Sequence, residues 1–97
     1  MEQPTEVPET IRNKALELVR EAYEDIARMV DAPLEKINAV KPPSMQYGSI
    51  NELIREYFAV AGSVATFAVN VELITPEQAR RVIVEFQAAH PEAYERF

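Results

Sequence analysis

The sequence predicts an all-α fold, a small bundle of three main helices and one short helix. Apolar residues recur at three- and four-residue steps along three long segments, and this is the period of the α-helix. Only two glycines occur, Gly48 and Gly62, whereas a fold of many strands needs many tight turns. A chain of 97 residues has the length of one domain. We therefore expect a flexible acidic N-terminal arm over residues 1–8 and a single helical domain over residues 9–97.

The first main helix is expected to begin near Pro8 or Glu9 and to continue to about Val30. Proline is favoured at the first helical position, and an acidic side chain is favoured near the positive end of the helix dipole. The apolar residues of this segment keep the helical period: Ile11, Ala15, Leu18, Val19, Ala22, Tyr23, Ile26, Ala27, Met29 and Val30. We expect this face to be buried in the bundle.

The short helix is expected over residues 32–39. Asp31 has the residue type of an N-cap, and Pro33 follows it closely, as at the start of many helices. Two consecutive prolines, Pro42 and Pro43, cannot continue a helix. Residues 41–48 are therefore expected to form the one real loop.

The second main helix is expected from Ile50 to about Val71. Ser49 and Glu52 before and within its first turn have the spacing of a capping box. Large apolar side chains cover a wide arc of this helix, and the strip that remains is small and uncharged. That strip consists of Ala59, Gly62, Ser63, Thr66 and Asn70. A helix without a charged face is expected to be surrounded by protein on most sides.

The third main helix is expected from Pro76 to Ala89. Thr75 has the residue type of an N-cap, and proline is favoured directly after it. One face is apolar and Val84 falls outside it; the face consists of Ala79, Val82, Ile83, Phe86 and Ala89. His90 precedes a proline and therefore ends the helix. Residues 91–97 are expected to add one turn that holds Tyr94 and Phe97 against the core.

The charge and composition exclude several classes of function. The net charge of −6 disfavours binding to nucleic acid and to anionic membranes, because both need clustered Lys and Arg. The chain has no cysteine, which excludes disulfides and thiolate chemistry and is compatible with a cytoplasmic location. Residues 1–9 lack the pattern of a secretory signal, and the uncharged run 57–71 is shorter than the roughly 20 residues of a membrane span. We expect a cytoplasmic protein with no membrane partner.

No pattern for catalysis stands out. His90 is the only histidine, and Glu85 and Glu92 lie near it in sequence. A histidine at the C-terminal end of a helix commonly interacts with the helix dipole and the last carbonyls, which explains its position without catalysis. The Glu-x-x-His pairs that hold metals in helical bundles are absent, and so is a glycine-rich phosphate loop. We therefore expect no enzymatic activity, no cofactor and no metal.

The leading hypothesis is a non-enzymatic protein–protein interaction or regulatory module that self-associates. It depends on abundant apolar helix surface in a chain without reactive residues. Twofold dimers are the commonest oligomers, so a homodimer is expected; the alternative is a monomer whose other helices cover residues 50–71. The predicted interface residues are Tyr47, Phe58, Gly62, Thr66, Asn70 and Val84.

Three other hypotheses remain open. An acidic inhibitor that mimics nucleic acid would use the net charge, although basic residues are mixed with the acidic ones. A helix-turn-helix-like DNA-binding protein would read bases with the helix that begins at Pro76. Its side chains would be Gln78, Arg81 and Glu85. A small-ligand or enzymatic site would lie between helices near Tyr23, Tyr57 and His90.

Overall fold

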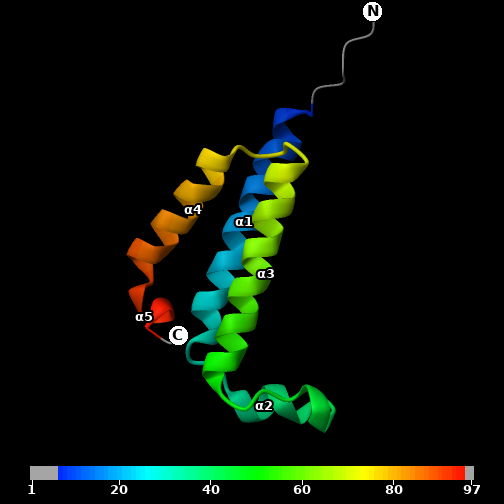
Figure 1. The fold of residues 1–97 in the computed structure, drawn as a ribbon, viewed down its shortest axis with the longest axis vertical. Coiled ribbons are helices and arrows are strands. Elements are labelled where there is room, and N and C mark those ends of the chain that lie inside the picture. The colour runs from blue at the N-terminus through cyan, green and yellow to red at the C-terminus, as the bar shows by residue number, and fades with distance from the viewer. Residues whose placement is uncertain (1–6, 96–97) are drawn as a thin grey trace, which may run out of the picture.

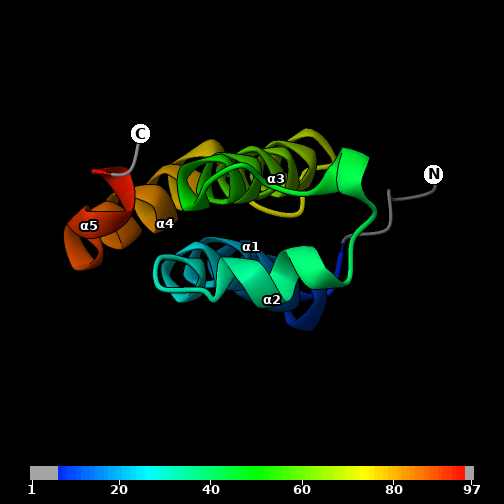
Figure 2. The ribbon, with the colours of Figure 1, turned by 90° about the horizontal axis from the view of Figure 1, so that it is seen from below.

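The computed structural model describes residues 7–95 and confirms the predicted all-α bundle (Figure 1). Its elements are α1 (Glu9–Met29), α2 (Leu34–Ala39), a 3₁₀ turn (Pro43–Met45), α3 (Ile50–Asn70), α4 (Pro76–Ala89) and α5 (Pro91–Tyr94). Most of the predicted N-terminal arm lies outside the described residues, and so does Phe97, which was expected to contact the core. The long helices α1 and α3 run antiparallel and lie side by side in both views (Figures 1 and 2).

The packing of α1 against α3 builds most of the core. The buried residues of α1 follow the helical period that the sequence predicts: Ala15, Val19, Tyr23 and Ile26. Three of the five buried residues of α3 are alanines. The five are Leu53, Ile54, Ala61, Ala65 and Ala68. Small side chains on α3 let the backbone of α1 approach closely, while the larger side chains of α1 fill the space between them. Complete burial of an aliphatic side chain such as Ile26 stabilises the fold by roughly 1.5–3 kcal/mol.

Helix α4 packs mainly on α1 and diverges from α3 along its length (Figure 1). Aromatic rings fill the space that this divergence opens. The ring of Phe58 on α3 lies 5.0 Å from that of Tyr94 on α5 and 6.2 Å from that of Phe86 on α4. The ring of Tyr23 on α1 lies 5.7 Å from that of Phe86. The single turn of α5, which the sequence predicts, thus helps to close the bundle with Tyr94.

The segment between α1 and α3 projects from one end of the bundle (Figure 1), and none of residues 31–49 is buried. Its shape is held by polar contacts. The Asn38 side chain donates to the carbonyl of Tyr47 and accepts from its amide, both at 2.8 Å. The Tyr47 hydroxyl donates to Glu56 on α3, and this contact ties the projecting segment to the bundle.

The helix caps agree only in part with the sequence pattern. Thr75 is the N-cap of α4, as predicted, and Gln78 completes a capping box with it. At α3 the Ser49 hydroxyl accepts from the Glu52 amide, but the Glu52 carboxylate accepts from the amide of Gly48, so the reciprocal half of the predicted box is shifted by one residue. The prediction that Asp31 caps α2 is wrong. Pro33 takes that position without a side-chain hydrogen bond, so α2 begins two residues later than expected.

The turn from α3 to α4 contains a backbone conformation that the sequence pattern did not predict. Glu72 has a positive φ of 62°, the left-handed conformation that glycine usually adopts after a helix. The amide of Glu72 donates to the carbonyl of Val69, and that of Leu73 donates to the carbonyl of Ala68. This is the hydrogen-bond pattern of a Schellman motif. Arg12 on α1 donates to the Glu72 carbonyl at 2.9 Å and so joins this turn to the first helix.

The expectation that α3 is surrounded by protein on most sides is wrong for its outer face. Within the described chain, α1, α4 and α5 cover only part of its circumference. Val60, Phe67 and Val71 are exposed, whereas the sequence pattern placed them in the buried arc. Two apolar residues of α1, Ile11 and Leu18, are also about half exposed.

Candidate interaction surface

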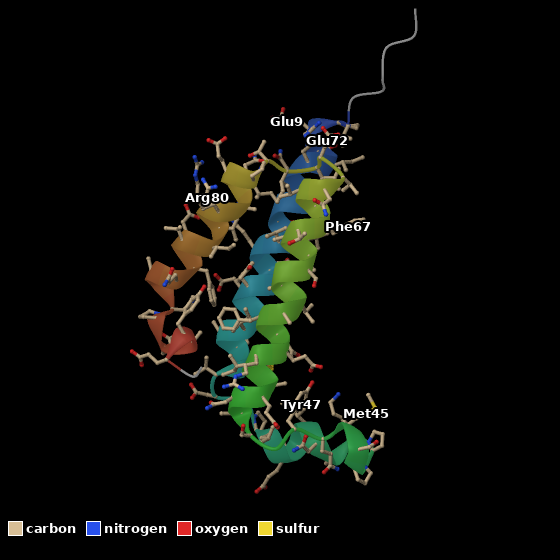
Figure 3. All side chains as sticks on the ribbon, in the orientation of Figure 1. Glu9, Met45, Tyr47, Phe67, Glu72 and Arg80 are labelled. Carbon is tan, nitrogen blue, oxygen red and sulfur yellow. The ribbon has the colours of Figure 1, made fainter. Side chains whose placement is uncertain are left out.

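The candidate site is the outer face of α3, here defined as Ala59, Val60, Gly62, Ser63, Thr66, Phe67 and Asn70. These residues lie on the side of the helix away from its buried positions, and none of them carries a charge. Phe67 is 64% exposed and Val60 is 55% exposed, both large values for apolar side chains. Figure 3 shows Phe67 projecting from α3 on the side away from α4. Large apolar side chains exposed on an uncharged helix face are typical of a binding site for another macromolecule.

Two hollows border this face and share three residues, Gly62, Thr66 and Asn70. The first hollow is a groove of about 400 Å³ between α3 and α4, lined on the α4 side by Pro76, Ala79, Arg80 and Ile83. The second is a shallow depression on α3 itself, lined also by Ala59, Ser63 and Phe67. Small side chains leave the backbone of α3 close to the surface in both hollows, and the divergence of α4 from α3 opens the first of them.

The groove has one charged lining residue, Arg80, at its α4 side. Its guanidinium is exposed near the upper end of α4 (Figure 3), and the structure gives it no ion pair within residues 7–95. The rest of the lining is apolar or small and polar. The groove therefore suits an apolar side chain that has an acidic group next to it.

The structure brings together three of the six predicted interface residues. Gly62, Thr66 and Asn70 lie on the outer face of α3 and line both hollows. Val84 is exposed on α4 and lines neither hollow. Tyr47 lies apart from them at the end where α2 projects, half-buried and bonded to Glu56 (Figure 3). Phe58 is half-buried in the aromatic cluster of the interior.

Sequence reasoning missed Phe67, Val60 and Arg80 as surface residues. A signal for the first two exists, because Val60 and Phe67 are seven residues apart and so share one side of the helix, about 100° from Ala61 and Ala68. No signal for Arg80 exists in the sequence alone. Its place at the groove depends on the angle at which α4 diverges from α3.

The third hypothetical site, near Tyr23, Tyr57 and His90, is only partly assembled. The ring of His90 lies 5.0 Å from that of Phe86, which also contacts Tyr23. Tyr57 is elsewhere, lining a hollow with Tyr47, Glu56 and Val60. The nitrogens of His90 face two carboxylates, Nε2 at 3.5 Å from Glu24 Oε1 and Nδ1 at 3.3 Å from Glu92 Oε2. Glu92 was a predicted neighbour of His90, whereas Glu24 reaches it from α1, and this pairing joins the end of α4 to the first helix.

Burial alters the acidity of two tyrosines in the interior. Loss of hydration raises the pKa of Tyr23 above its usual value, and the nearby Tyr94 raises it further. Loss of hydration also raises the pKa of Tyr94. Both hydroxyls are therefore neutral at physiological pH and act as ordinary packing groups with a polar edge.

Within residues 7–95, no three acidic or histidine side chains are grouped so that they would hold a metal ion. None of the helices in this described range has the length and apolarity needed to cross a membrane.

Fold and surface together define a small all-α bundle with one long helix incompletely covered. Comparison with known proteins adds no relative, since the chain matches no family model, no curated protein and no solved structure.

Proposed function

We propose that this protein is a non-enzymatic protein–protein interaction module, regulatory in role, that binds through the outer face of α3 and self-associates there. The observation that carries the proposal is the uncharged exposed surface of α3 around Phe67. A solvated helix face normally carries Lys, Glu or Arg, and this one has none from Tyr57 to Val71. Burial of Phe67 and Val60 against another protein would remove apolar area from water and so drive association.

The two hollows next to this face support the same proposal. A flat apolar surface offers little selectivity, whereas a groove beside a projecting ring fits only a partner of matching shape. Aromatic side chains at the centre of an interface commonly contribute most of the binding free energy. In this proposal Phe67 is that residue, and the partner is a cytoplasmic protein or a second copy of the chain.

The experiment is site-specific photo-crosslinking in the cells that make the protein. A photoreactive phenylalanine analogue replaces Phe67 in one variant and Leu18 in the matched control, since Leu18 is an exposed apolar residue of α1. We expect position 67 to form covalent adducts with one defined protein, and position 18 to form few. Binding of that protein, purified, is then expected to be lost in Thr66→Glu, which places a charge on the face.

Equal adduct yields at positions 67 and 18 would count against the proposal. So would a purified partner that binds Thr66→Glu as well as the parent chain. An adduct between two copies supports the self-association part, and an adduct with a different protein supports the module without it.

The alternative functions have less support. The mimic of nucleic acid needs a continuous acidic surface, but basic side chains interrupt the carboxylates of α1: Lys14 pairs with Glu17, and Arg28 pairs with Asp25. The DNA-binding hypothesis places Gln78, Arg81 and Glu85 toward bases. These side chains are exposed on α4, but a glutamate among them and the net charge of −6 oppose contact with phosphates.

A further inference from the structure

A hollow of about 340 Å³ lies where the projecting segment meets α3, and it is lined by Tyr47, Glu56, Tyr57 and Val60. Its volume is in the range of small-ligand pockets, roughly 300–1,000 Å³. We propose that this hollow binds an alkylated ammonium group, such as the trimethylammonium of choline or of a trimethylated lysine side chain. The hollow shares only Val60 with the outer face of α3, and the proposal does not depend on the proposed function.

The lining combines aromatic rings with one negative charge. Two of its residues are tyrosines, both half-buried, and a tyrosine ring attracts a cation placed over its face. Glu56 is the single charged residue of the lining. Its carboxylate accepts from the Tyr47 hydroxyl, and among residues 7–95 it has no cation within ion-pair distance. A lining of this composition attracts cations and repels anions.

The Tyr47 ring already holds one cation of the chain itself. The ammonium nitrogen of Lys41 lies over this ring, 5.3 Å from its centroid. Lys41 is not among the residues that line the hollow, so its contact with the ring leaves the hollow open. The hollow offers a second cation what Lys41 lacks, namely a second ring and a carboxylate beside the first ring.

Tyr47 is held in position although no residue of its segment is buried. The Asn38 side chain bonds to both its carbonyl and its amide at 2.8 Å, and Glu56 accepts from its hydroxyl. Figure 3 shows Tyr47 at the junction between the segment and the bundle. The other three lining residues belong to α3, where Glu56 and Val60 are one turn apart on the same side. The lining is therefore ordered before a ligand binds, which lowers the entropic cost of binding.

The small number of acceptors favours an alkylated ammonium over an unmodified one. A primary ammonium has three N–H donors, and each donor left without an acceptor on burial costs free energy. The lining offers one carboxylate, already bonded to Tyr47, and two phenol oxygens. A trimethylammonium has no N–H group, and its methyl groups carry the positive charge onto the rings and pack against Val60.

Two ligands of equal shape test the role of the positive charge. Choline and its neutral isostere dimethylbutanol differ in one atom, because carbon replaces the nitrogen in the second. Each is titrated into the full isotope-labelled chain, and the amide NMR shifts of Tyr57 and Val60 are followed. We expect choline to saturate with a dissociation constant of roughly 1–10 mM and dimethylbutanol to bind at least about fivefold more weakly. Equal binding of the two, or no saturable shift with choline, overturns the proposal.

Substitutions test the residues of the site. Tyr57→Leu removes one ring, and Glu56→Gln removes the charge but keeps an acceptor for the Tyr47 hydroxyl. Each is expected to weaken choline binding by about threefold to fivefold, whereas Tyr57→Phe retains the ring and the affinity. The matched control for charge is Glu77→Gln, exposed at the start of α4 at the opposite end of the bundle (Figure 1). Thermal unfolding checks that each variant folds, and unchanged affinity in both Tyr57→Leu and Glu56→Gln overturns the assignment.

A second pair of ligands identifies the source of the ammonium group. Trimethyllysine with both backbone ends blocked is compared with the same blocked residue without methyl groups. Tighter binding of trimethyllysine than of choline supports the site and assigns it to a modified protein side chain, whereas tighter binding of choline supports it and assigns it to a free small molecule. Unmethylated lysine that binds as tightly as trimethyllysine overturns the selection for an alkylated ammonium.

Discussion

At the scale of single residues, Glu72 shows how a local conformation determines the join between two helices. Its left-handed backbone allows the amides of Glu72 and Leu73 to satisfy carbonyls at the end of α3. The glutamate side chain takes no part in this, so the position tolerates glycine and would benefit from it.

We predict that Glu72→Gly stabilises the protein by about 0.5–1 kcal/mol, because glycine adopts positive φ without a steric penalty. Urea unfolding followed by circular dichroism measures the change. Glu72→Ala is the control, since it removes the same charge and keeps the Cβ. Equal stabilisation by both variants would assign the effect to charge and contradict the backbone explanation.

The two buried tyrosines predict a loss of stability in alkali. Their pKa values are higher in the folded chain than the ordinary value of 10.0, so the unfolded chain loses these protons first as pH rises. The stabilisation from the neutral hydroxyls is complete below pH about 10 and is lost above it. We expect Tyr23→Phe to show a smaller decrease in unfolding free energy than the parent chain between neutral pH and pH about 11. Parallel curves for the two proteins would rule out Tyr23 as a contributor.

At the scale of elements, the sequence was sufficient where local chemistry decides the outcome. The bounds of α4 were predicted exactly, because Thr75, Pro76 and the His90-Pro91 pair each have strong positional preferences. The start of α2 was predicted two residues too early. Asp31 and Ala32 belong to a turn that continues from the end of α1, and Pro33 is the N-cap of α2. Which face of α3 meets α1 was also undetermined. Ala61, Ala65 and Ala68 form a second set of small residues, and these rather than Ala59 and Gly62 face the core.

The capping box of α4 gives a prediction at this scale. Thr75→Ala removes the acceptor of the Gln78 amide and is expected to destabilise the protein by about 1 kcal/mol. Thr75→Ser retains the hydroxyl and is expected to retain most of that stability. Thermal unfolding of the three proteins provides the comparison, and an alanine variant as stable as the serine variant would show that the cap does not matter.

At the scale of the whole molecule, α1 and α3 form the densest part of the bundle, and α4 with α5 is attached more loosely. The attachment consists chiefly of three side chains of α4 and the rings around Phe86. We therefore expect amides of α4 to exchange with deuterium faster than the central amides of α1 and α3, since local opening requires less apolar surface to be exposed. Hydrogen exchange read by mass spectrometry tests this, and uniform protection of the three helices would contradict it.

The candidate surface was predictable only in outline. The uncharged strip of α3, which includes Gly62, Thr66 and Asn70, was predicted from the sequence, because the absence of charged residues can be seen there directly. The groove beside it was not predictable, because it arises from the divergence of α4 from α3 (Figure 1). That divergence accommodates large rings packed between α3, α4 and α5, such as Phe58 and Tyr94. The absence of charge on one helix face can be seen from the residues of that helix alone. The space between two helices depends instead on every side chain that separates them.

The projecting segment between α1 and α3 has a consequence for the speed of folding. The core contacts between α1 and α3 form only after residues 31–49 have closed into a loop, and none of these residues is buried in the folded protein. The entropy of closing such a loop changes slowly with its length, by about 0.6 kcal/mol for each doubling. A longer segment would therefore lower the rate at which α1 and α3 pack together, and a shorter one would raise it. The core of the folded protein would not change. Insertions and deletions in this segment are therefore expected to leave the packing of α1 on α3 intact, provided that they spare the Asn38–Tyr47 and Tyr47–Glu56 contacts.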